Sequence, residues 1–203
     1  MEFWNSLLTE KSWKVLQQLK KANFRFLVIG GWAAYLWTKQ HKSKDLDIVI
    51  PEIKDLSLLK EKYLLVKNDH LKKYEIKFGE IDLDIYLPYY SQLSLPFKVI
   101  CRNTAKIESF EVVSPEVLLI LKQGAELDRG ESIKGQKDRI DILSLLCYAP
   151  VNFSRYRSLL AEQKLEHYRL RLKEIIQNFR EVQHLNLNVQ QYAKIKKRLL
   201  AEI

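Results

Sequence analysis

The sequence predicts a mixed α/β (α+β) protein, in which a mixed β-sheet flanked by helices precedes a C-terminal helical region. In the first half, short apolar runs alternate with acids or stop at glycines, as strands do, and helical patterns lie between them. From Ser114 onward the apolar residues recur with helical spacing. We therefore expect a sheet domain over residues 1–113 and a helical domain over residues 114–203.

The sheet domain opens with a helix over residues 10–22, because Trp13, Leu16 and Leu19 recur every three residues and share one face. The elements expected after it are a strand over 24–29, a helix over 32–39, a strand over 45–50, a helix over 56–66, paired strands over 73–78 and 81–87, and strands over 97–101 and 107–113.

The helical domain begins at Ser114, a natural N-cap, followed by Pro115 at the first helical position. The expected helices cover residues 115–128, 134–148, 153–183 and 188–202. In the third, an apolar stripe at spacings of three and four comprises Leu165, Tyr168, Leu172, Ile175, Phe179 and Val182. Such a stripe packs either within its own chain or against a second subunit of a homodimer.

Charge is unevenly distributed along the 203 residues. The formal net charge is +9, and residues 151–203 hold 11 lysines and arginines against 5 glutamates. This excess favours a polyanionic partner such as RNA, or equally a well-solvated surface of basic helices.

Composition argues against several classes of protein. No apolar run approaches the roughly 18 residues that a membrane helix needs. The first residues mix polar and apolar types, unlike a signal peptide, so we expect a cytoplasmic protein. Cys101 and Cys147 lie far apart among apolar neighbours, which favours two buried thiols over a disulfide or a zinc site.

A strand that stops at Gly30-Gly31 and continues into a helix is the first functional signal. Glycine allows a sharp turn and a close approach of the backbone to a ligand. The helix N-terminus offers free N–H groups to a phosphate. By itself, such a glycine pair more often marks an ordinary turn.

Two acidic strands supply the second signal. Asp45 and Asp47 point to the same face of the first strand, because side chains alternate along a strand. Asp82 and Asp84 occupy a later strand in the same way. Three carboxylates gathered from neighbouring strands suit two Mg²⁺ ions about 3.5–4 Å apart, as used in phosphoryl transfer.

The order of these pieces resembles the DNA polymerase beta-like nucleotidyltransferase superfamily. Further segments similar to the helical half of the AbiEii-type and small antibiotic nucleotidyltransferases are Val113-Ser114-Pro115-Glu116, Leu121-Lys122, Arg129, Lys137-Asp138 and Asp141-Ile142. The resemblance covers roughly residues 24–148.

The resemblance implies specific contacts with an incoming nucleoside triphosphate (NTP). Gly30 and Gly31 would lie against its triphosphate. Ser43 matches a family position near the phosphates. Lys122 and Lys137 would lie near the nucleotide, although on residue chemistry alone each is also an ordinary salt-bridging helix residue.

The resemblance also assigns the acids. Asp45, Asp47 and a third aspartate would be the catalytic, metal-binding residues. The family's strand pattern puts Asp84 in the third position, with Asp82 as the alternative.

The expected activity is transfer of a nucleoside monophosphate to an acceptor hydroxyl with release of pyrophosphate. The acceptor could be RNA such as a tRNA 3′ end, a small hydroxylated molecule or a protein. The AbiEii-type resemblance suggests a toxin with an antitoxin partner. The alternative is a non-catalytic nucleotide- or RNA-binding module of the same fold. A carboxylate–metal nuclease ranks last, because it has no need for the glycine pair.

Overall fold

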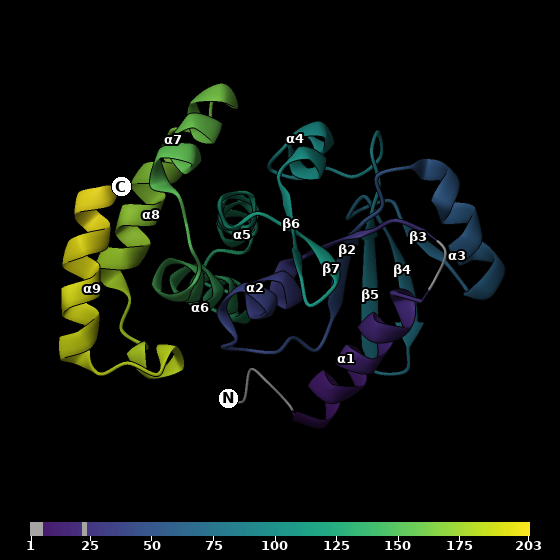
Figure 1. Ribbon diagram of the computed structural model, residues 1–203, viewed down its shortest axis with the longest axis horizontal. Coiled ribbons are helices and arrows are strands. Elements are labelled where there is room, and N and C mark those ends of the chain that lie inside the picture. The colour runs from purple at the N-terminus through teal and green to yellow at the C-terminus, as the bar shows by residue number, and fades with distance from the viewer. Residues whose placement is uncertain (1–5, 22–23) are drawn as a thin grey trace. The chain divides into compact units, whose positions relative to one another are not determined.

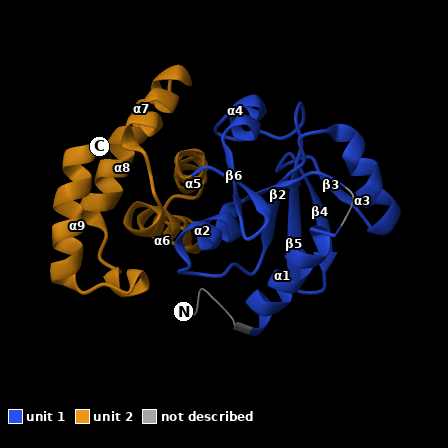
Figure 2. Cartoon of the chain, in the orientation of Figure 1, with its two compact units in different colours: residues 1–114 blue, residues 115–203 orange. Residues whose placement is uncertain are grey.

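The computed structural model describes residues 6–21 and 24–203, and the chain divides into two compact units (Figure 2). The first unit is Met1–Ser114 and the second is Pro115–Ile203. The described strands all belong to the first unit, and the described elements of the second are helices. The predicted mixed α/β class is confirmed.

Seven strands of the described residues form one mixed sheet, in the order β3-β4-β5-β2-β1-β7-β6 (Figure 1). Their bounds are β1 Leu27–Ile29, β2 Leu46–Val49, β3 Val66–Asn68, β4 Lys73–Phe78, β5 Ile81–Tyr86, β6 Thr104–Ile107 and β7 Phe110–Val113. Strand β2 lies in the middle, parallel to β5 and antiparallel to β1. Strands β1 and β7 are also parallel, and the other pairs are antiparallel.

The two central strands β2 and β5 have one apolar side and one polar side. Leu46 pairs with Leu83 and Ile48 with Ile85, and these four side chains are fully buried. Residues between them point to the opposite side and are only half-buried. The apolar side anchors both strands in the core, which fixes their register and thereby the position of every polar side chain on the other side.

The first unit also contains helices, of which α1 and α2 contact the sheet. They are α1 Ser6–Leu19, α2 Gly30–Thr38, the 3₁₀ turn η1 Ile53–Asp55, α3 Leu56–Lys62 and α4 Phe97–Arg102. Trp13 of α1 stacks on Trp32 of α2 with ring centroids 5.1 Å apart, and the Trp32 indole N–H donates to Ser12 Oγ at 2.8 Å. This contact joins α1 to α2, the helix that leads from the glycine pair.

The second unit consists of α5 Pro115–Arg129, α6 Ile133–Tyr148, α7 Phe153–Glu162, α8 His167–Asn178, the 3₁₀ turn η2 Val182–Leu185 and α9 Val189–Glu202. Buried hydrogen bonds tie these helices together: Tyr156 donates to Gln123 Oε1 at 2.7 Å, and the Gln123 amide donates to the Tyr168 carbonyl at 2.8 Å. Within the described part of the chain, no helix combines the length and apolar character that crossing a membrane requires.

Two predicted elements are wrong. Residues 97–101, expected as a strand, form helix α4, because the N–H groups of Val99 and Ile100 both donate to the Pro96 carbonyl and close a helical turn. The long helix over 153–183 is broken after Glu162, where Lys164 adopts a left-handed φ of 58°. An apolar run is compatible with either secondary structure, so the local hydrogen bonds decide.

Smaller differences concern element bounds. Strand β3 was not expected, and the strand predicted over 107–113 covers the end of β6, the turn and all of β7 in a hairpin of these two strands. Helix α1 begins earlier than predicted, and residue 22, its predicted end, lies outside the described residues. Part of the apolar stripe predicted for the helix over 153–183 is present, because Tyr168, Leu172 and Ile175 are buried on α8. A homodimer remains a prediction.

Candidate active site

Asp47 and Asp84 lie side by side on the polar side of the two central strands. Strands β2 and β5 run parallel, and Asp47 is the register partner of Asp84. Neighbouring strands are about 4.8 Å apart, so both carboxylates start from adjacent backbone positions. Asp82 is not the partner of Asp47. The register therefore singles out Asp84 as the acid of β5 that stands beside Asp47.

The Asp84 carboxylate is in an unfavourable position for a negative charge. Its side chain is 16% exposed, and its Oδ1 is buried with no hydrogen-bond partner among the described residues. Burial, followed by the charge of Asp47, raises the pKa of Asp84 to about 6. Lys73 acts in the opposite direction through a contact of 2.5 Å to Asp84 Oδ2.

Strand β4 adds two residues that the sequence reasoning missed. Glu75 is the antiparallel register partner of Asp84, and Lys73 Nζ lies 3.0 Å from Glu75 Oε1. The Asn68 side-chain amide also donates to Glu75 at 3.0 Å. Burial alone would lower the pKa of Lys73, but the two carboxylates offset this and raise it. Asp84 is thus flanked by a carboxylate on each neighbouring strand.

Gly30 makes room for Asp47. Strand β1 pairs Ile29 with Asp47, and Gly30 follows with φ +66°, a conformation that glycine adopts readily. A Cβ added to Gly30 would lie 2.1 Å from Asp47 Oδ2. Helix α2 begins at Gly30, and Gly31 is buried in its first turn. The glycine that starts the helix is therefore also required by the neighbouring carboxylate.

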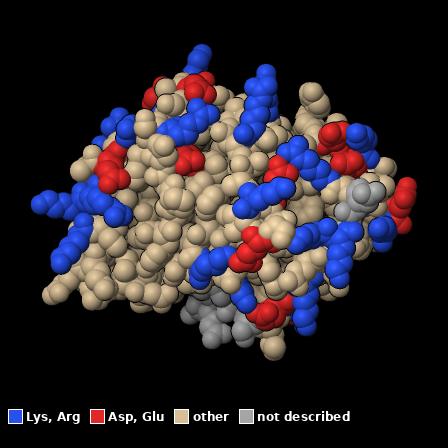
Figure 3. Space-filling model, viewed as in Figure 1, with Lys and Arg blue, Asp and Glu red and all other residues tan. Residues whose placement is uncertain are grey.

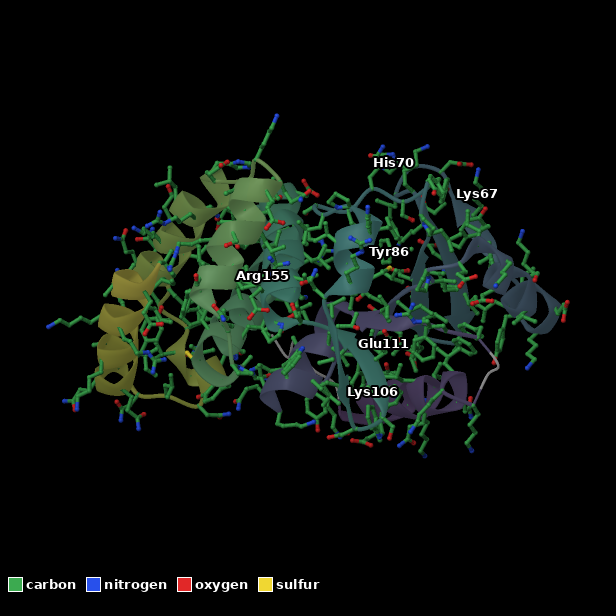
Figure 4. The ribbon with its side chains drawn as sticks, turned by 45° about the horizontal axis from the view of Figure 1, so that its top comes forward. Lys67, His70, Tyr86, Lys106, Glu111 and Arg155 are labelled. Atoms are coloured by element: carbon green, nitrogen blue, oxygen red, sulfur yellow. The ribbon has the colours of Figure 1, made fainter. Side chains whose placement is uncertain are left out.

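Asp45 is oriented differently from Asp47. It lies just before β2, its side chain is 45% exposed, and its Oδ1 accepts a hydrogen bond from the Asp82 backbone N–H at 3.3 Å. Tyr86, labelled in Figure 4, lies with its hydroxyl 3.4 Å from Asp47 Oδ1 as a donor. Across residues 6–21 and 24–203, no three histidine, cysteine or acidic side chains form a group that could hold a metal ion. Asp45 in this orientation does not join the pair formed by Asp47 and Asp84.

The donor chemistry of the pair nevertheless fits a hard divalent cation. Mg²⁺ prefers carboxylate oxygens, and both Asp47 and Asp84 supply them. The Asp84 oxygen without a hydrogen-bond partner and the raised pKa of its carboxyl both reflect negative charge that is incompletely neutralised. A cation bound beside Asp47 would relieve this.

The remaining predicted nucleotide-binding residues lie elsewhere in the chain. Ser43 is buried in the segment between α2 and β2. Lys122 on α5 is buried and contacts Asp138 Oδ1 at 2.9 Å and Asp141 Oδ2 at 2.7 Å. Lys137 is half-buried on α6. Both lysines belong to the second unit, and their proximity to a nucleotide stays a prediction.

The charges of Lys122, Arg129, Asp138 and Asp141, here called the Lys122 cluster, neutralise one another. Arg129 Nη1 lies 2.7 Å from Asp138 Oδ2 and adds a second positive charge. Burial alone would lower the pKa of Lys122, but Asp141 and Asp138 outweigh it and raise that pKa. This arrangement explains why a lysine interrupts the apolar stretch of α5: its ion pairs join α5 to α6 and stabilise their contact.

Comparisons with known proteins bear on the fold. No protein-family model and no curated protein matches the chain. The solution structure of the antibiotic-resistance factor ANT(2″)-Ia aligns with a TM-score of 0.56 at 13% identity, covering 82% of this chain and 96% of that one. A crystal structure of ANT(2″)-Ia with adenylyl-2″-tobramycin aligns at 0.52 and 13% identity, covering 80% and 99%. A putative nucleotidyltransferase from H. pylori aligns at 0.51 and 17% identity, covering 97% and 96%. The chain therefore has the fold of nucleotidyltransferase-like proteins.

Proposed function

We propose that the protein is a divalent-metal-dependent nucleotidyltransferase, which transfers a nucleoside monophosphate from an NTP to an acceptor hydroxyl and releases pyrophosphate. The observation that carries this proposal is the register pairing of Asp47 with Asp84 beside Gly30, where helix α2 begins. Paired carboxylates next to a helix N-terminus suit a metal-bound triphosphate. The shared fold supports the same activity without naming a substrate.

The proposed site divides its tasks among a few residues. Asp45, Asp47 and Asp84 would hold Mg²⁺, and we expect two ions. Asp45 would first turn away from the Asp82 backbone N–H, which now donates to it. Bound Mg²⁺ would neutralise charge on the triphosphate and favour ionisation of the attacking hydroxyl. The backbone N–H groups after Gly30 and Gly31 would bind phosphate oxygens.

Bond making and proton transfer follow from this assignment. The acceptor oxygen bonds to the α-phosphorus while the bond to the bridging oxygen of pyrophosphate breaks. The hydroxyl proton would pass to one of the carboxylates of the site, which acts as the general base. Ser43, Lys122 and Lys137 are the proposed further contacts to the nucleotide.

RNA is the acceptor that the charge distribution favours. Residues 151–203 carry most of the net positive charge, and basic side chains project among acidic ones on the face drawn in Figure 3. ANT(2″)-Ia was determined with adenylyl-2″-tobramycin, so a small hydroxylated molecule is the second acceptor class to test. A toxin role with an antitoxin partner belongs to the same proposal, on the AbiEii-type resemblance.

One observation favours a second function, a nucleotide- or RNA-binding module without catalysis. Lys73 contacts Asp84, and the described acids do not form a three-ligand group. An ammonium that stays on Asp84 would keep a metal ion from that carboxylate, and the protein would then bind nucleotide without activating it. The two functions differ in whether the nucleoside monophosphate is transferred from the NTP to an acceptor.

Label transfer tests the proposal. The protein is incubated with Mg²⁺ and each α-³²P-labelled NTP, with tRNA, total RNA, aminoglycosides or protein as acceptors. We expect label in one acceptor pool, and its loss in Asp47→Asn and Asp84→Asn. Asp82→Asn is the matched control, since it removes an acid from the same side of the same strand. Bound NTP without transfer to any pool would support the binding module. Full activity of Asp84→Asn would contradict the assignment of the site.

A further inference from the structure

Lys73 is a positively charged residue on the acidic side of the sheet. Its Nζ lies 2.5 Å from Asp84 Oδ2 and 3.0 Å from Glu75 Oε1. The three side chains are 12%, 16% and 21% exposed for Lys73, Asp84 and Glu75. Partial burial strengthens both ion pairs compared with pairs in full solvent. The ammonium is therefore firmly held in the structure without metal.

The register of three neighbouring strands explains why an ammonium is needed there. Asp47, Asp84 and Glu75 occupy paired positions on β2, β5 and β4, so their carboxylates stand in a row on one side of the sheet. Like charges on adjacent strands repel. Lys73 supplies one positive charge against three negative ones, and Asp84 Oδ1 keeps no hydrogen-bond partner among the described residues. The row retains an excess negative charge that a further cation would neutralise.

We infer that Lys73 is a built-in cation, which holds Asp84 in the metal-free protein and must leave it before Asp84 can bind a metal ion. This inference rests on the metal site of the proposed function and assigns a positioning role to a residue outside that site. An ammonium and a divalent ion on the same carboxylate repel each other strongly at such short range. The two cations therefore compete for Asp84.

The local geometry allows this exchange. Lysine carries its charge on a flexible four-carbon chain, so its ammonium can move without a change in the strand. Glu75 already contacts Lys73 and offers a partner after the ammonium leaves Asp84. A triphosphate adds negative charge that compensates for the second cation. Metal loading at Asp84 should consequently depend on the nucleotide, with weak binding of the free ion.

Metal binding in matched variants tests the inference. Isothermal titration with Mn²⁺, without nucleotide, would compare the wild type with Lys73→Gln, Lys73→Arg and Lys77→Gln. Lys77 lies four residues further along β4, on the same side and exposed, so its variant controls for a general loss of charge. We expect Lys73→Gln to bind Mn²⁺ at least about tenfold more tightly, because the competing charge is gone. Lys73→Arg and Lys77→Gln should bind as the wild type does. Unchanged or weaker binding by Lys73→Gln would overturn the inference.

A second measurement needs no variant and so does not depend on the folding of Lys73→Gln. Acylation of lysine amines in the wild type is followed by mass spectrometry with and without Mn²⁺–NTP. Lys73 should react several-fold faster when the metal complex is bound, because its ammonium has left Asp84, whereas Lys77 should not change. Equal reactivity of Lys73 in both states would contradict the exchange.

These outcomes are distinguishable from failure of the proposed function. If neither the wild type nor Lys73→Gln binds Mn²⁺ with or without NTP, the metal site is wrong and both proposals are overturned. If label transfer depends on Asp47 and Asp84 but Mn²⁺ affinity does not respond to Lys73→Gln, the enzyme assignment stands and only the role of Lys73 is wrong.

Discussion

Two lysines of this protein each lie between two carboxylates, in different surroundings. Lys73 contacts Asp84 and Glu75 in the sheet at 2.5 and 3.0 Å. In the helical unit, Lys122 contacts Asp138 and Asp141 at 2.9 and 2.7 Å. By distance alone the two clusters are equivalent. They differ in charge balance and in burial.

The helical cluster is closed and balanced. Asp138 and Asp141 are 2% and 3% exposed, and Arg129 supplies a second positive charge. The sheet cluster is more open, and Asp47 adds a third carboxylate beside its single lysine. Perturbed pKa values arise in structural ion clusters as well as in active sites, so the perturbation does not distinguish them. The uncompensated negative charge does distinguish the two clusters, and it indicates that the sheet cluster is the candidate active site.

The largest expected difference between the clusters is in stability. Lys122→Met leaves Asp141 buried without its ammonium partner and Asp138 with Arg129 alone, and we expect a loss of about 3–5 kcal/mol in the free energy of unfolding. Lys73→Met should cost about 1 kcal/mol, because the more exposed acids keep some solvent and Asp84 can take up a proton. All four tryptophans lie within residues 1–114, so urea unfolding followed by tryptophan fluorescence reports on the sheet unit, and circular dichroism reports on the helices. Equal losses for the two variants would remove the distinction.

Gly30→Ala should have the next largest effect and be confined to the sheet. The new Cβ would overlap Asp47 Oδ2 at 2.1 Å, and the residue has a φ of +66°. We expect a loss of about 2–4 kcal/mol from the left-handed backbone and the overlap together. Gly79→Ala is the matched control, with a φ of +64° and nothing within 4 Å of the added atom. It should cost only about 1–2 kcal/mol. Tryptophan fluorescence in urea would measure both, and similar losses would show that Asp47 does not need the space.

The smallest expected effect is a difference in pH dependence. The pKa of Asp84 is raised to about 6, so the folded state binds this proton more tightly than the unfolded chain. Its contribution to the free energy of unfolding should therefore increase by about 1–3 kcal/mol as the pH falls from 7 to 4. Burial would raise the pKa of Asp138, but Lys122 and Arg129 outweigh it and lower that pKa. The contribution of Asp138 is instead lost in more acidic solution, below about pH 4.

Asp84→Asn provides the measurement for this pH effect. The difference in unfolding free energy between the wild type and Asp84→Asn should change in favour of the wild type as the pH falls from 7 to 4. Urea unfolding at half-unit pH intervals, without metal, would give this difference. A difference that is constant over this range would show that Asp84 titrates normally in the folded protein.

Much of the fold was predictable because strands and helices have distinct periods. The alternation of Ile81, Leu83 and Ile85 with acids predicted β5, and the structure has this strand. Residues 97–101 were predicted wrongly because a mostly apolar run of five residues, interrupted by Lys98, is too short to show either period. The break after Glu162 was missed for another reason: it depends on the left-handed backbone at Lys164, which no glycine marks.

The role of β4 was within reach of the sequence. A two-residue turn at Gly79-Glu80 pairs Phe78 with Ile81, and counting three residues back pairs Glu75 with Asp84. Alternation then puts Lys73 on the same side as Glu75. These steps identify the neighbours of Asp84 on one side, but they do not show which of them forms an ion pair.

The sequence by itself determined which residues face the same side of each strand, because that depends only on the local period of the backbone. It thereby supplied Asp45 and Asp47 on one strand, and Asp82 and Asp84 on another, as candidates. Only the tertiary structure decided that β2 and β5 are parallel neighbours, that Gly30 borders Asp47, and that Asp45 turns to the Asp82 N–H. Strand order and side-chain pairing arise from the packing of distant segments, which a local pattern does not encode.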